Sequence, residues 1–172
     1  MPLGEGTARG YDRQCKGQYP CGAHGCPVHR ILLRGRFKEL RPGLTSASTP
    51  GTSSWLGFSA GRPGFSLVWA FTNKGFRVEL YIDVNDRDMN KALFDALKER
   101  SAQLEALIGS PLSWERLDNM RASRLAIYTA LPASPSVDEN PALADWAVET
   151  MVRWNDGLRT SLASLEPAEM EP

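Results

Sequence analysis

The stretch FSLVWAFTNKGFRVELYID, from Phe65 to Asp83, decides the fold of this chain. Apolar and polar residues alternate along both of its halves, which is the pattern of β-strands that turn one face to a core. The halves are separated by Asn73-Lys74-Gly75, where the glycine can adopt the positive φ that a tight turn requires. The sequence therefore predicts a β-hairpin. The apolar face consists of Phe65, Leu67, Trp69, Phe71, Phe76, Val78, Leu80 and Ile82.

Further strands and helices are predicted on both sides of this hairpin. Residues 55–60 alternate as an earlier strand, and the turn at 61–64 contains two glycines and a proline. Apolar residues at helical spacing predict one helix from Asp86, which offers an N-cap, to Gly109, which can close it in the left-handed conformation. Two short strands at 112–117 and 124–129 either extend the sheet or pair as a second hairpin. A last helix runs from Asn140-Pro141 to Leu165.

The predicted order is β-β-β-α-β-β-α. It indicates an α+β fold in which an antiparallel sheet of about five strands carries two long helices packed on one face. We expect one domain at residues 51–166, because a chain of 172 residues suffices for one sizeable core. Residues 1–50 are rich in Gly, Arg, Pro and Ser, so we expect a disordered basic tail and linker there. Residues 167–172 are expected to fray.

Charge is unevenly distributed along a chain whose formal net charge is zero. Residues 1–44 hold eight Lys and Arg against three Asp and Glu, and residues 45–172 hold twelve against seventeen. Nucleic-acid binders usually carry a basic field on the folded body, whereas here only the tail is basic. No run of about 18 apolar residues indicates a transmembrane helix, and the start has no signal-peptide pattern. We interpret the chain as cytoplasmic, and nothing in it indicates a cofactor.

All cysteines and histidines of the chain lie in the predicted tail. Thiolates and imidazoles are the usual ligands of tetrahedral zinc, so Cys21, His24, Cys26 and His29 could hold a metal, with Cys15 to spare. The spacing matches no zinc-finger pattern, in which two ligand pairs flank a loop long enough to wrap the ion. The alternative interpretation is a tail with free thiols.

The sheet face opposite the helices is the main candidate for binding. Its polar residues are Arg77, Glu79, Tyr81 and Asp83, joined by Glu115 and Arg124. Such a face could recognise a phosphate, a peptide or a nucleic-acid segment. Alternatively, it is a solvated surface with cross-strand ion pairs, each of which contributes only about 0.2–1 kcal/mol.

Sequence signals for catalysis are weak. Restriction-type nucleases need an acidic residue two positions before a lysine on a strand, and in Glu79-Leu80-Tyr81 the lysine position is a tyrosine. No GxSxG or P-loop motif occurs, and both histidines lie in the tail. Catalysis is therefore not expected. The residual enzyme hypothesis is a metal-dependent nuclease-like site at Glu79, Asp83 and Glu115.

Three segments carry a family resemblance: SWLGFSAGRPGF from Ser54, FRVELYID from Phe76, and NKALFDALKERSAQLEALIGSPLSWERLDNMRASRLAIY from Asn90. From about Ser54 to Leu165 the chain resembles domain-of-unknown-function family 4268. The resemblance implies a prokaryotic accessory role near DNA, since members often follow a domain that resembles a restriction nuclease. The motif positions, to which no activity is attached, are Arg62, Glu79, Tyr81, Asn90, Lys91, Glu115, Arg116, Arg121 and Arg124.

The sequence therefore favours a non-catalytic binding module that assists a nuclease-like or other DNA-acting partner. Its partner would be nucleic acid or a nuclease-like protein, contacted through the mixed-charge sheet face or the segment 116–124. The predicted binding residues are Arg62, Arg77, Glu79, Tyr81, Asp83, Glu115, Arg116, Arg121 and Arg124. The alternative is a protein-interaction or dimerisation domain, with no nucleic-acid contact, that associates through the helix carrying Trp146 and Trp154.

Overall fold

The central hairpin forms as the sequence predicts. Strand β2 (Phe65–Thr72) pairs antiparallel with β3 (Gly75–Ile82), from Phe65 opposite Ile82 to Thr72 opposite Gly75. Gly75 has φ of 111°, a conformation that glycine adopts without strain. The computed structural model describes Leu40 and residues 54–72, 75–130 and 141–166. The Cys and His residues of the predicted zinc site lie outside the described residues.

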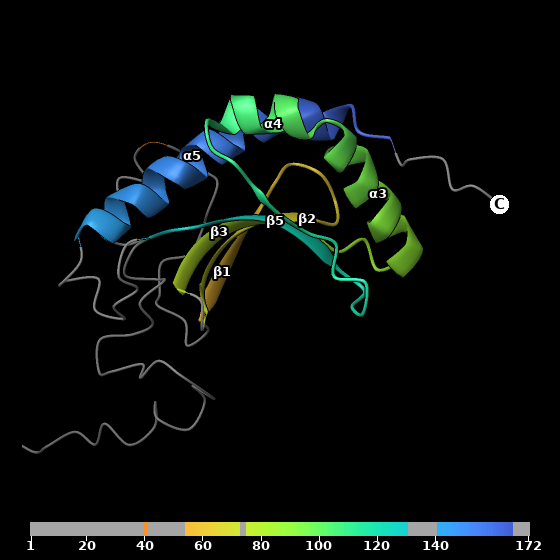
Figure 1. Cartoon of the computed structure of the whole chain (residues 1–172), viewed down its shortest axis with the longest axis horizontal. Coiled ribbons are helices and arrows are strands. Elements are labelled where there is room, and N and C mark those ends of the chain that lie inside the picture. Colours follow the sequence, from red (N-terminus) through yellow and green to blue (C-terminus); the bar gives the residue numbers. More distant parts are fainter. Residues whose placement is uncertain (1–39, 41–53, 73–74, 131–140, 167–172) are drawn as a thin grey trace, which may run out of the picture.

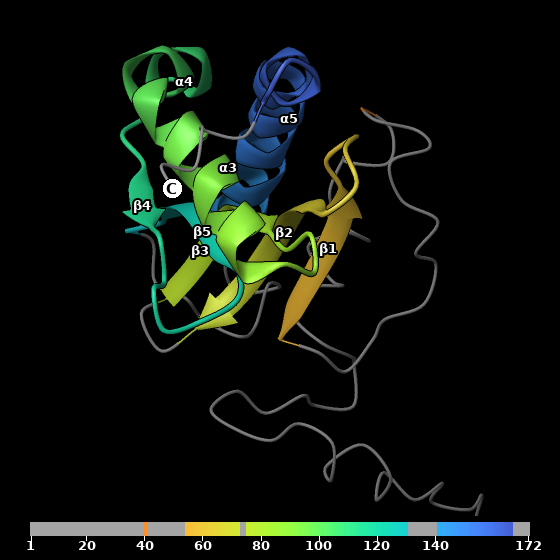
Figure 2. The same ribbon diagram turned by 90° about the vertical axis from the view of Figure 1, so that its right-hand side faces the viewer.

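The hairpin is the middle of a five-stranded antiparallel sheet with the order β1-β2-β3-β5-β4. The other strands are β1 (Trp55–Ser59), β4 (Ser113–Glu115) and β5 (Ser123–Tyr128). Both outcomes considered for the two late strands occur together, because β4 pairs with β5 and β5 adds to β3. The structure thus confirms an α+β fold, with the described helices on one face of the sheet (Figures 1 and 2).

The predicted helix between Asp86 and Gly109 is two helices, α3 (Arg87–Glu99) and α4 (Ser101–Ile108). Asp86 caps α3 as predicted, since its Oδ1 accepts a hydrogen bond of 2.7 Å from the Met89 amide. Arg100 has φ −96° and ψ 18° and bends the chain, so α3 packs on β3 and β5 while α4 packs on α5 (Pro141–Ala163). Residues 54–166, where described, therefore contain three helices in place of the two long ones that were expected.

The core lies between the helices and the predicted apolar face of the hairpin. Trp69 is fully buried and its Nε1 donates to the Ala147 carbonyl of α5, 3.1 Å away. Phe76 packs edge-on against Trp146, with ring centroids 6.1 Å apart. These contacts fix α5 over β2 and β3. None of the described helices is long and apolar enough to cross a membrane.

Turn chemistry accounts for the connection between β1 and β2. Gly64 has φ of 80°, and a Cβ atom there would lie 2.9 Å from the Cα atom of Val84. The Gly64 carbonyl accepts a hydrogen bond of 2.7 Å from the Asp83 amide. The turn therefore packs directly on the segment that follows β3. Only glycine can stand at position 64, because any side chain there would collide with Val84.

Candidate functional site

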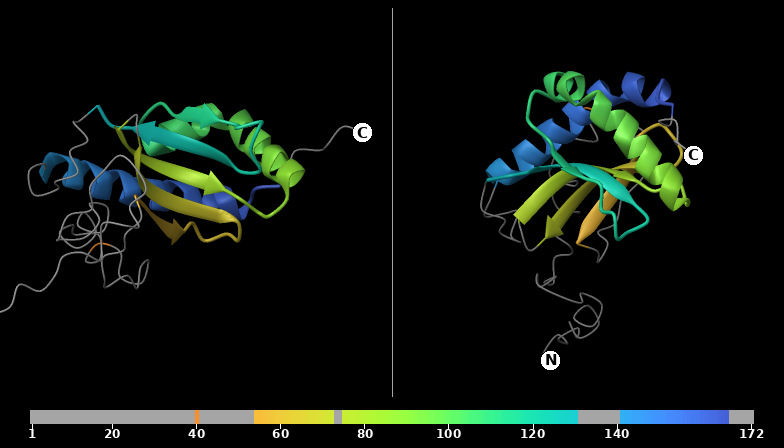
Figure 3. Two further views of the ribbon diagram at one scale, coloured as in Figure 1. Left: turned by 90° about the horizontal axis from the view of Figure 1, so that it is seen from below. Right: turned by 45° about the vertical axis from the view of Figure 1, so that its right-hand side comes forward.

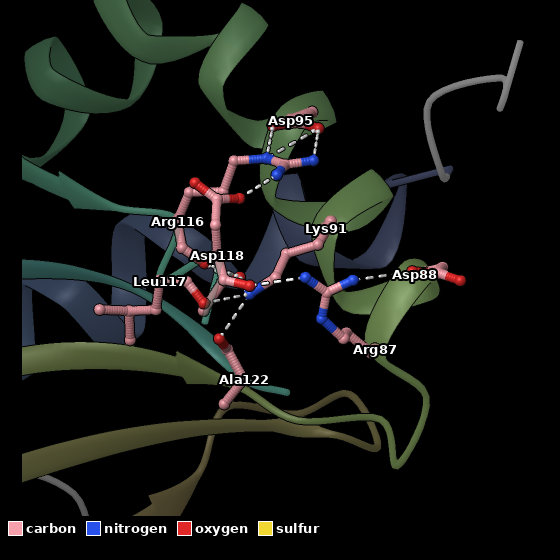
Figure 4. Close-up of polar contacts among 9 residues, drawn as sticks. Arg87, Asp88, Lys91, Asp95, Arg116, Leu117, Asp118 and Ala122 are labelled. Atoms are coloured by element: carbon pink, nitrogen blue, oxygen red, sulfur yellow. Dashed lines mark hydrogen bonds and ion pairs between the residues drawn. The ribbon is translucent and has the colours of Figure 1, made fainter. Parts of the chain in front are cut away.

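A buried lysine holds the loop between β4 and β5. Lys91 lies on the first turns of α3 and is only 4% exposed. Its Nζ donates to backbone carbonyls of Arg116 (2.6 Å), Leu117 (3.0 Å) and Ala122 (2.8 Å), and it lies 3.0 Å from Ser123 Oγ (Figure 4). Because an ammonium group has three protons, these acceptors use its donor capacity in full. Lys91 thus fixes the backbone of residues 116–122, which we call the β4–β5 loop.

The neighbouring Asn90 joins this loop to the end of β3. Its Oδ1 accepts a hydrogen bond of 2.8 Å from the Val84 amide, and its Nδ2 donates to the Arg121 carbonyl, 3.2 Å away. Asn90 is fully buried, and both sides of its amide have a partner. The Asn-Lys pair of the family motif therefore ties two loops to α3.

Two arginines of the β4–β5 loop form ion pairs with carboxylates. Arg121 makes a bidentate pair with Asp83, in which both N–O distances are 2.8 Å, and its Nη1 donates to Asn85 Oδ1. Arg116 lies between Asp95 of α3, with two N–O distances of 3.0 Å, and Asp118 of its own loop (Figure 4). These pairs place the arginine charges beside carboxylates.

The tip of the β4–β5 loop is exposed, whereas its base, the part of the loop that Lys91 holds, is not. Asp118, Asn119 and Met120 face solvent, and Met120 is 50% exposed. Met89, at the start of α3, is a second exposed methionine, at 37%. We call Met89 and residues 118–121 the loop surface. It combines apolar and polar side chains on a backbone that Lys91 holds from beneath.

Four other predicted site residues meet, together with Tyr128, on the sheet face opposite the helices. Arg77, Glu79, Glu115, Arg124 and Tyr128 form what we call the sheet-face network. Arg77 Nε donates to Glu79 Oε2 (2.6 Å), Arg124 Nε to Glu115 Oε2 (2.7 Å) and the Tyr128 hydroxyl to Glu115 Oε1 (2.8 Å). These residues belong to β3, β4 and β5, and Figure 3, left, shows the sheet in front of the helices.

The sheet-face network differs from the exposed surface that the alternation predicts. Glu79 is only 3% exposed, and the side chains of Arg124 and Glu115 are 20% and 19% exposed. The polar residues do occupy one face, as predicted, but they are paired with one another and largely buried. Arg77 pairs with Glu79 along β3 and Arg124 pairs with Glu115 across β5 and β4, so each carboxylate has an arginine at hydrogen-bond distance.

Local contacts shift the pKa values of several of these groups. The hydrogen bonds from Arg121 lower the pKa of Asp83. Burial would raise the pKa of Glu115, but the hydrogen bonds from Tyr128 and Arg124 outweigh burial and lower it. Burial lowers the pKa of Lys91, and the charge of Asp118 opposes this effect. Asp83 and Glu115 therefore stay charged at a lower pH than ordinary carboxyl groups.

The remaining predicted residues lie apart. Arg62 donates to the Leu162 and Leu165 carbonyls, 2.8 and 2.5 Å away, and so caps the end of α5. Tyr81 on β3 lies opposite Arg124 on β5 and is partly buried. The three acids of the residual metal hypothesis are not grouped: Glu79 and Glu115 share Arg124, whereas Asp83 pairs with Arg121. No three metal-ligating side chains within the described residues are grouped to hold an ion.

Sequence reasoning missed Asp95, Asp118, Ser123 and Tyr128 as partners. It named Asn90 and Lys91 only as motif positions. One signal was available: Asn90 precedes Leu93, Phe94 and Leu97 at helical spacing, so a polar residue occupies the apolar stripe of α3. A polar group there must find a buried partner, and Asn90 finds two.

Comparisons with known proteins identify a family and no function. No curated protein matches the chain, and no solved structure matches it. One family model, described as "Domain of unknown function (DUF4268)", matches residues 33–157. The match covers well over half of the chain and begins ahead of Ser54, inside the segment that the sequence predicted to be a tail. The chain therefore belongs to the DUF4268 family.

Proposed function

We propose that this domain is a non-catalytic accessory module that recognises a protein partner through the loop surface. The observation that carries the proposal is the contrast between the base and the tip of the β4–β5 loop. The base is held by four hydrogen-bond acceptors around Lys91, whereas the tip exposes Met120. A loop ordered in advance loses little conformational entropy on binding, which favours affinity.

The charge arrangement supports a protein partner over nucleic acid. Phosphate recognition uses arginines that are free to approach the backbone of the nucleic acid. Here Arg116 and Arg121 are both held by carboxylates, and a phosphate would have to compete with Asp95, Asp118 and Asp83. Nucleic acid stays the alternative to test, because the basic segment 1–44 lies outside the described residues apart from Leu40.

The charged groups that could serve catalysis have structural partners, which supports an accessory role. Lys91 donates to backbone carbonyls, and Glu79 and Glu115 accept from arginines. The family resemblance adds a context, since it implies a nuclease-like or other DNA-acting protein in a prokaryote. Such a protein is the first partner to test.

Self-association through α5 receives less support. Trp154 is fully buried and Trp146 packs against Phe76, so the tryptophan stripe of α5 belongs to the core of the domain. A homo-oligomer would have to use another surface, and the loop surface is available for that role.

The test uses the full chain with a photo-reactive amino acid at Met120, and at Gln103 as a matched exposed control on α4. Irradiation in the source cell should capture one protein from position 120 that is not captured from position 103. The captured protein is then purified, and its binding to the unlabelled chain should weaken at least tenfold in Met120→Asp but not in Gln103→Asp.

Titration of the chain against labelled single-stranded and double-stranded DNA, at low and moderate salt, provides the opposing measurement. Salt-sensitive DNA binding that is lost in an Arg116→Gln, Arg121→Gln double variant would overturn the protein-partner proposal. A captured protein that binds Met120→Asp as tightly as the native chain would also overturn it.

A further inference from the structure

Strand β1 is an edge of the sheet, and half of its backbone groups point away from β2 (Figure 2). At its two ends, the Phe71 amide donates to the Ser54 carbonyl (2.9 Å) and the Ala60 amide donates to the Phe65 carbonyl (3.2 Å). Along an antiparallel pair, residues that exchange hydrogen bonds alternate with residues that do not. The even-numbered positions of 54–60 therefore bond to β2, and the amides and carbonyls of the odd-numbered positions point outward.

These outward positions are Trp55, Gly57 and Ser59, and all three residues are exposed. Within the described part of the chain, no residue forms a hydrogen bond with their outward backbone groups. Proteins usually protect a sheet edge with a charged residue, a proline or a very short strand. The other edge, β4, has three residues and carries Glu115, whereas the five residues of β1 include no charge and no proline. The edge at β1 is therefore open to another strand.

The side chains at the outward positions suit a second copy of the same strand. If two β1 strands pair antiparallel about a twofold axis at Gly57, Trp55 lies opposite Ser59 of the second copy, and glycine lies opposite glycine. This register gives partners to the outward groups at all three positions, and any shift leaves some unpaired. It also sets the largest side chain against a small one and brings no charges together.

The exposure of Trp55 supports this arrangement. Its side chain is large and apolar, yet the residue is 57% exposed, and tryptophan is enriched in protein interfaces. The ring lies along the strand, because its Cζ3 atom would be 3.6 Å from a Cβ atom at Gly57. The indole therefore flanks the position of the axis, where a second strand would cover it.

We propose that two copies of this chain associate through β1, antiparallel and about a twofold axis at Gly57, so that their sheets join into one continuous sheet. This inference goes beyond the proposed function and does not rest on it. The β4–β5 loop lies toward the opposite edge of the sheet, so the dimer leaves both loop surfaces accessible. Two short strands bury little area, so the dimer should dissociate on dilution.

The first test is sedimentation equilibrium of the full chain at low salt, which should show a monomer–dimer equilibrium. Gly57→Lys and Gly57→Asp each set like charges opposite one another at the axis, so each variant alone should dimerise roughly fivefold more weakly or worse. A Cβ atom at position 57 makes only ordinary contacts, so both variants should fold. An equimolar mixture of the two should recover the lost affinity, because an ammonium group then faces a carboxylate.

The matched controls are Gln103→Lys and Gln103→Asp at an exposed position of α4, and neither should alter the equilibrium. A native chain that stays monomeric at every concentration would overturn the proposal. So would Gly57 variants that dimerise as tightly as the native chain. A mixture that associates no better than its components would overturn the twofold register.

Photo-crosslinking tests the same register without a charge in the strand. Benzoylphenylalanine replaces Trp55, and in a control sample it replaces Leu107, a large apolar residue of α4 with a similar exposure of 48%. Irradiation of a mixture of nitrogen-15-labelled and unlabelled chains should give a covalent dimer from position 55, joined to residues 57–59 of the other copy, and none from position 107. No covalent dimer from position 55, or one joined to a different segment, would overturn the proposal.

Discussion

The Nζ atom of Lys91 lies 3.0 Å from the carbonyl oxygen of Leu117, a residue with left-handed backbone geometry, φ 56°. For a leucine this conformation costs roughly 1–2 kcal/mol. The same carbonyl accepts a hydrogen bond of 2.8 Å from the Met120 amide. A buried ammonium group beneath this unfavourable turn and a backbone hydrogen bond across it thus maintain it.

Replacing Lys91 by methionine tests this relationship. The substitution keeps the length of the side chain but removes the Lys91 hydrogen bonds to three carbonyls, of which Leu117 keeps its bond from the Met120 amide and Arg116 keeps its bond from the Ser123 hydroxyl. We therefore expect a loss of about 3 kcal/mol in the free energy of unfolding. Urea denaturation measures it. Lys98→Met is the control, because Lys98 is exposed and lies 4.6 Å from the Trp114 ring centroid, where its contribution should stay below about 1 kcal/mol. Equal losses in the two variants would contradict the structural role of Lys91.

The contrast between predicted and unpredicted features follows from the range of the interactions. The hairpin at 65–82 was predictable because alternation is local, and so was the αL cap at Gly109, whose φ is 73°. The environment of Lys91 was not, because its acceptors are carbonyls 25 to 31 positions away that carry no side-chain signature. The bend at Arg100 also escaped prediction, since it depends on the packing of α4 against α5.

The candidate site shows the same division. The alternation of apolar and polar residues along β3 correctly placed Arg77, Glu79 and Tyr81 on the sheet face away from the helices. It could not show that Glu79 is buried, because burial depends on what packs around it. Tyr128 was missed as a partner of Glu115 for a similar reason: strand pairing sets which residues meet, and the order of β4 and β5 in the sheet was left open.

Acid should weaken the pair between Asp83 and Arg121 in a defined pH range. The pKa of Asp83 is lowered in the folded state, so its pairing stabilises the fold above the ordinary aspartate pKa of 3.8 and is lost as pH falls through the lower folded value. We expect the stability difference between the native chain and Asp83→Asn to be constant above about pH 5 and to shrink below about pH 4. Thermal unfolding across pH 2.5–7 measures it, with the exposed Asp145→Asn variant as control. A difference that stays constant down to pH 2.5 would contradict the ion pair.

The turn at Gly64 offers a test of backbone packing. In Gly61→Ala only the left-handed φ of 87° opposes the new methyl group, and the expected cost is about 1 kcal/mol. In Gly64→Ala the methyl group also meets Val84, so the loss should reach about 2–4 kcal/mol. Chemical denaturation of both variants gives the comparison. If Gly61→Ala proves the more damaging, the close approach of the turn to Val84 is wrong.

Removing Glu79 should be costly because it would leave Arg77 without a carboxylate and Arg124 with Glu115 alone, at the centre of the sheet. Arg77 Nε lies 2.6 Å from Glu79 Oε2, and Arg124 Nε lies 3.7 Å from the same oxygen. With Glu79 only 3% exposed, Glu79→Leu should reduce the free energy of unfolding by about 3 kcal/mol. The exposed pair Arg87 and Asp88 is the control, and Asp88→Leu should cost less than about 1 kcal/mol. Combining Glu79→Leu with Arg77→Met should recover part of the loss, since the second change removes the arginine charge that Glu79→Leu leaves unpaired. Urea unfolding of the three variants measures this coupling, and a double variant that is no more stable than Glu79→Leu would show that the arginine does not depend on Glu79.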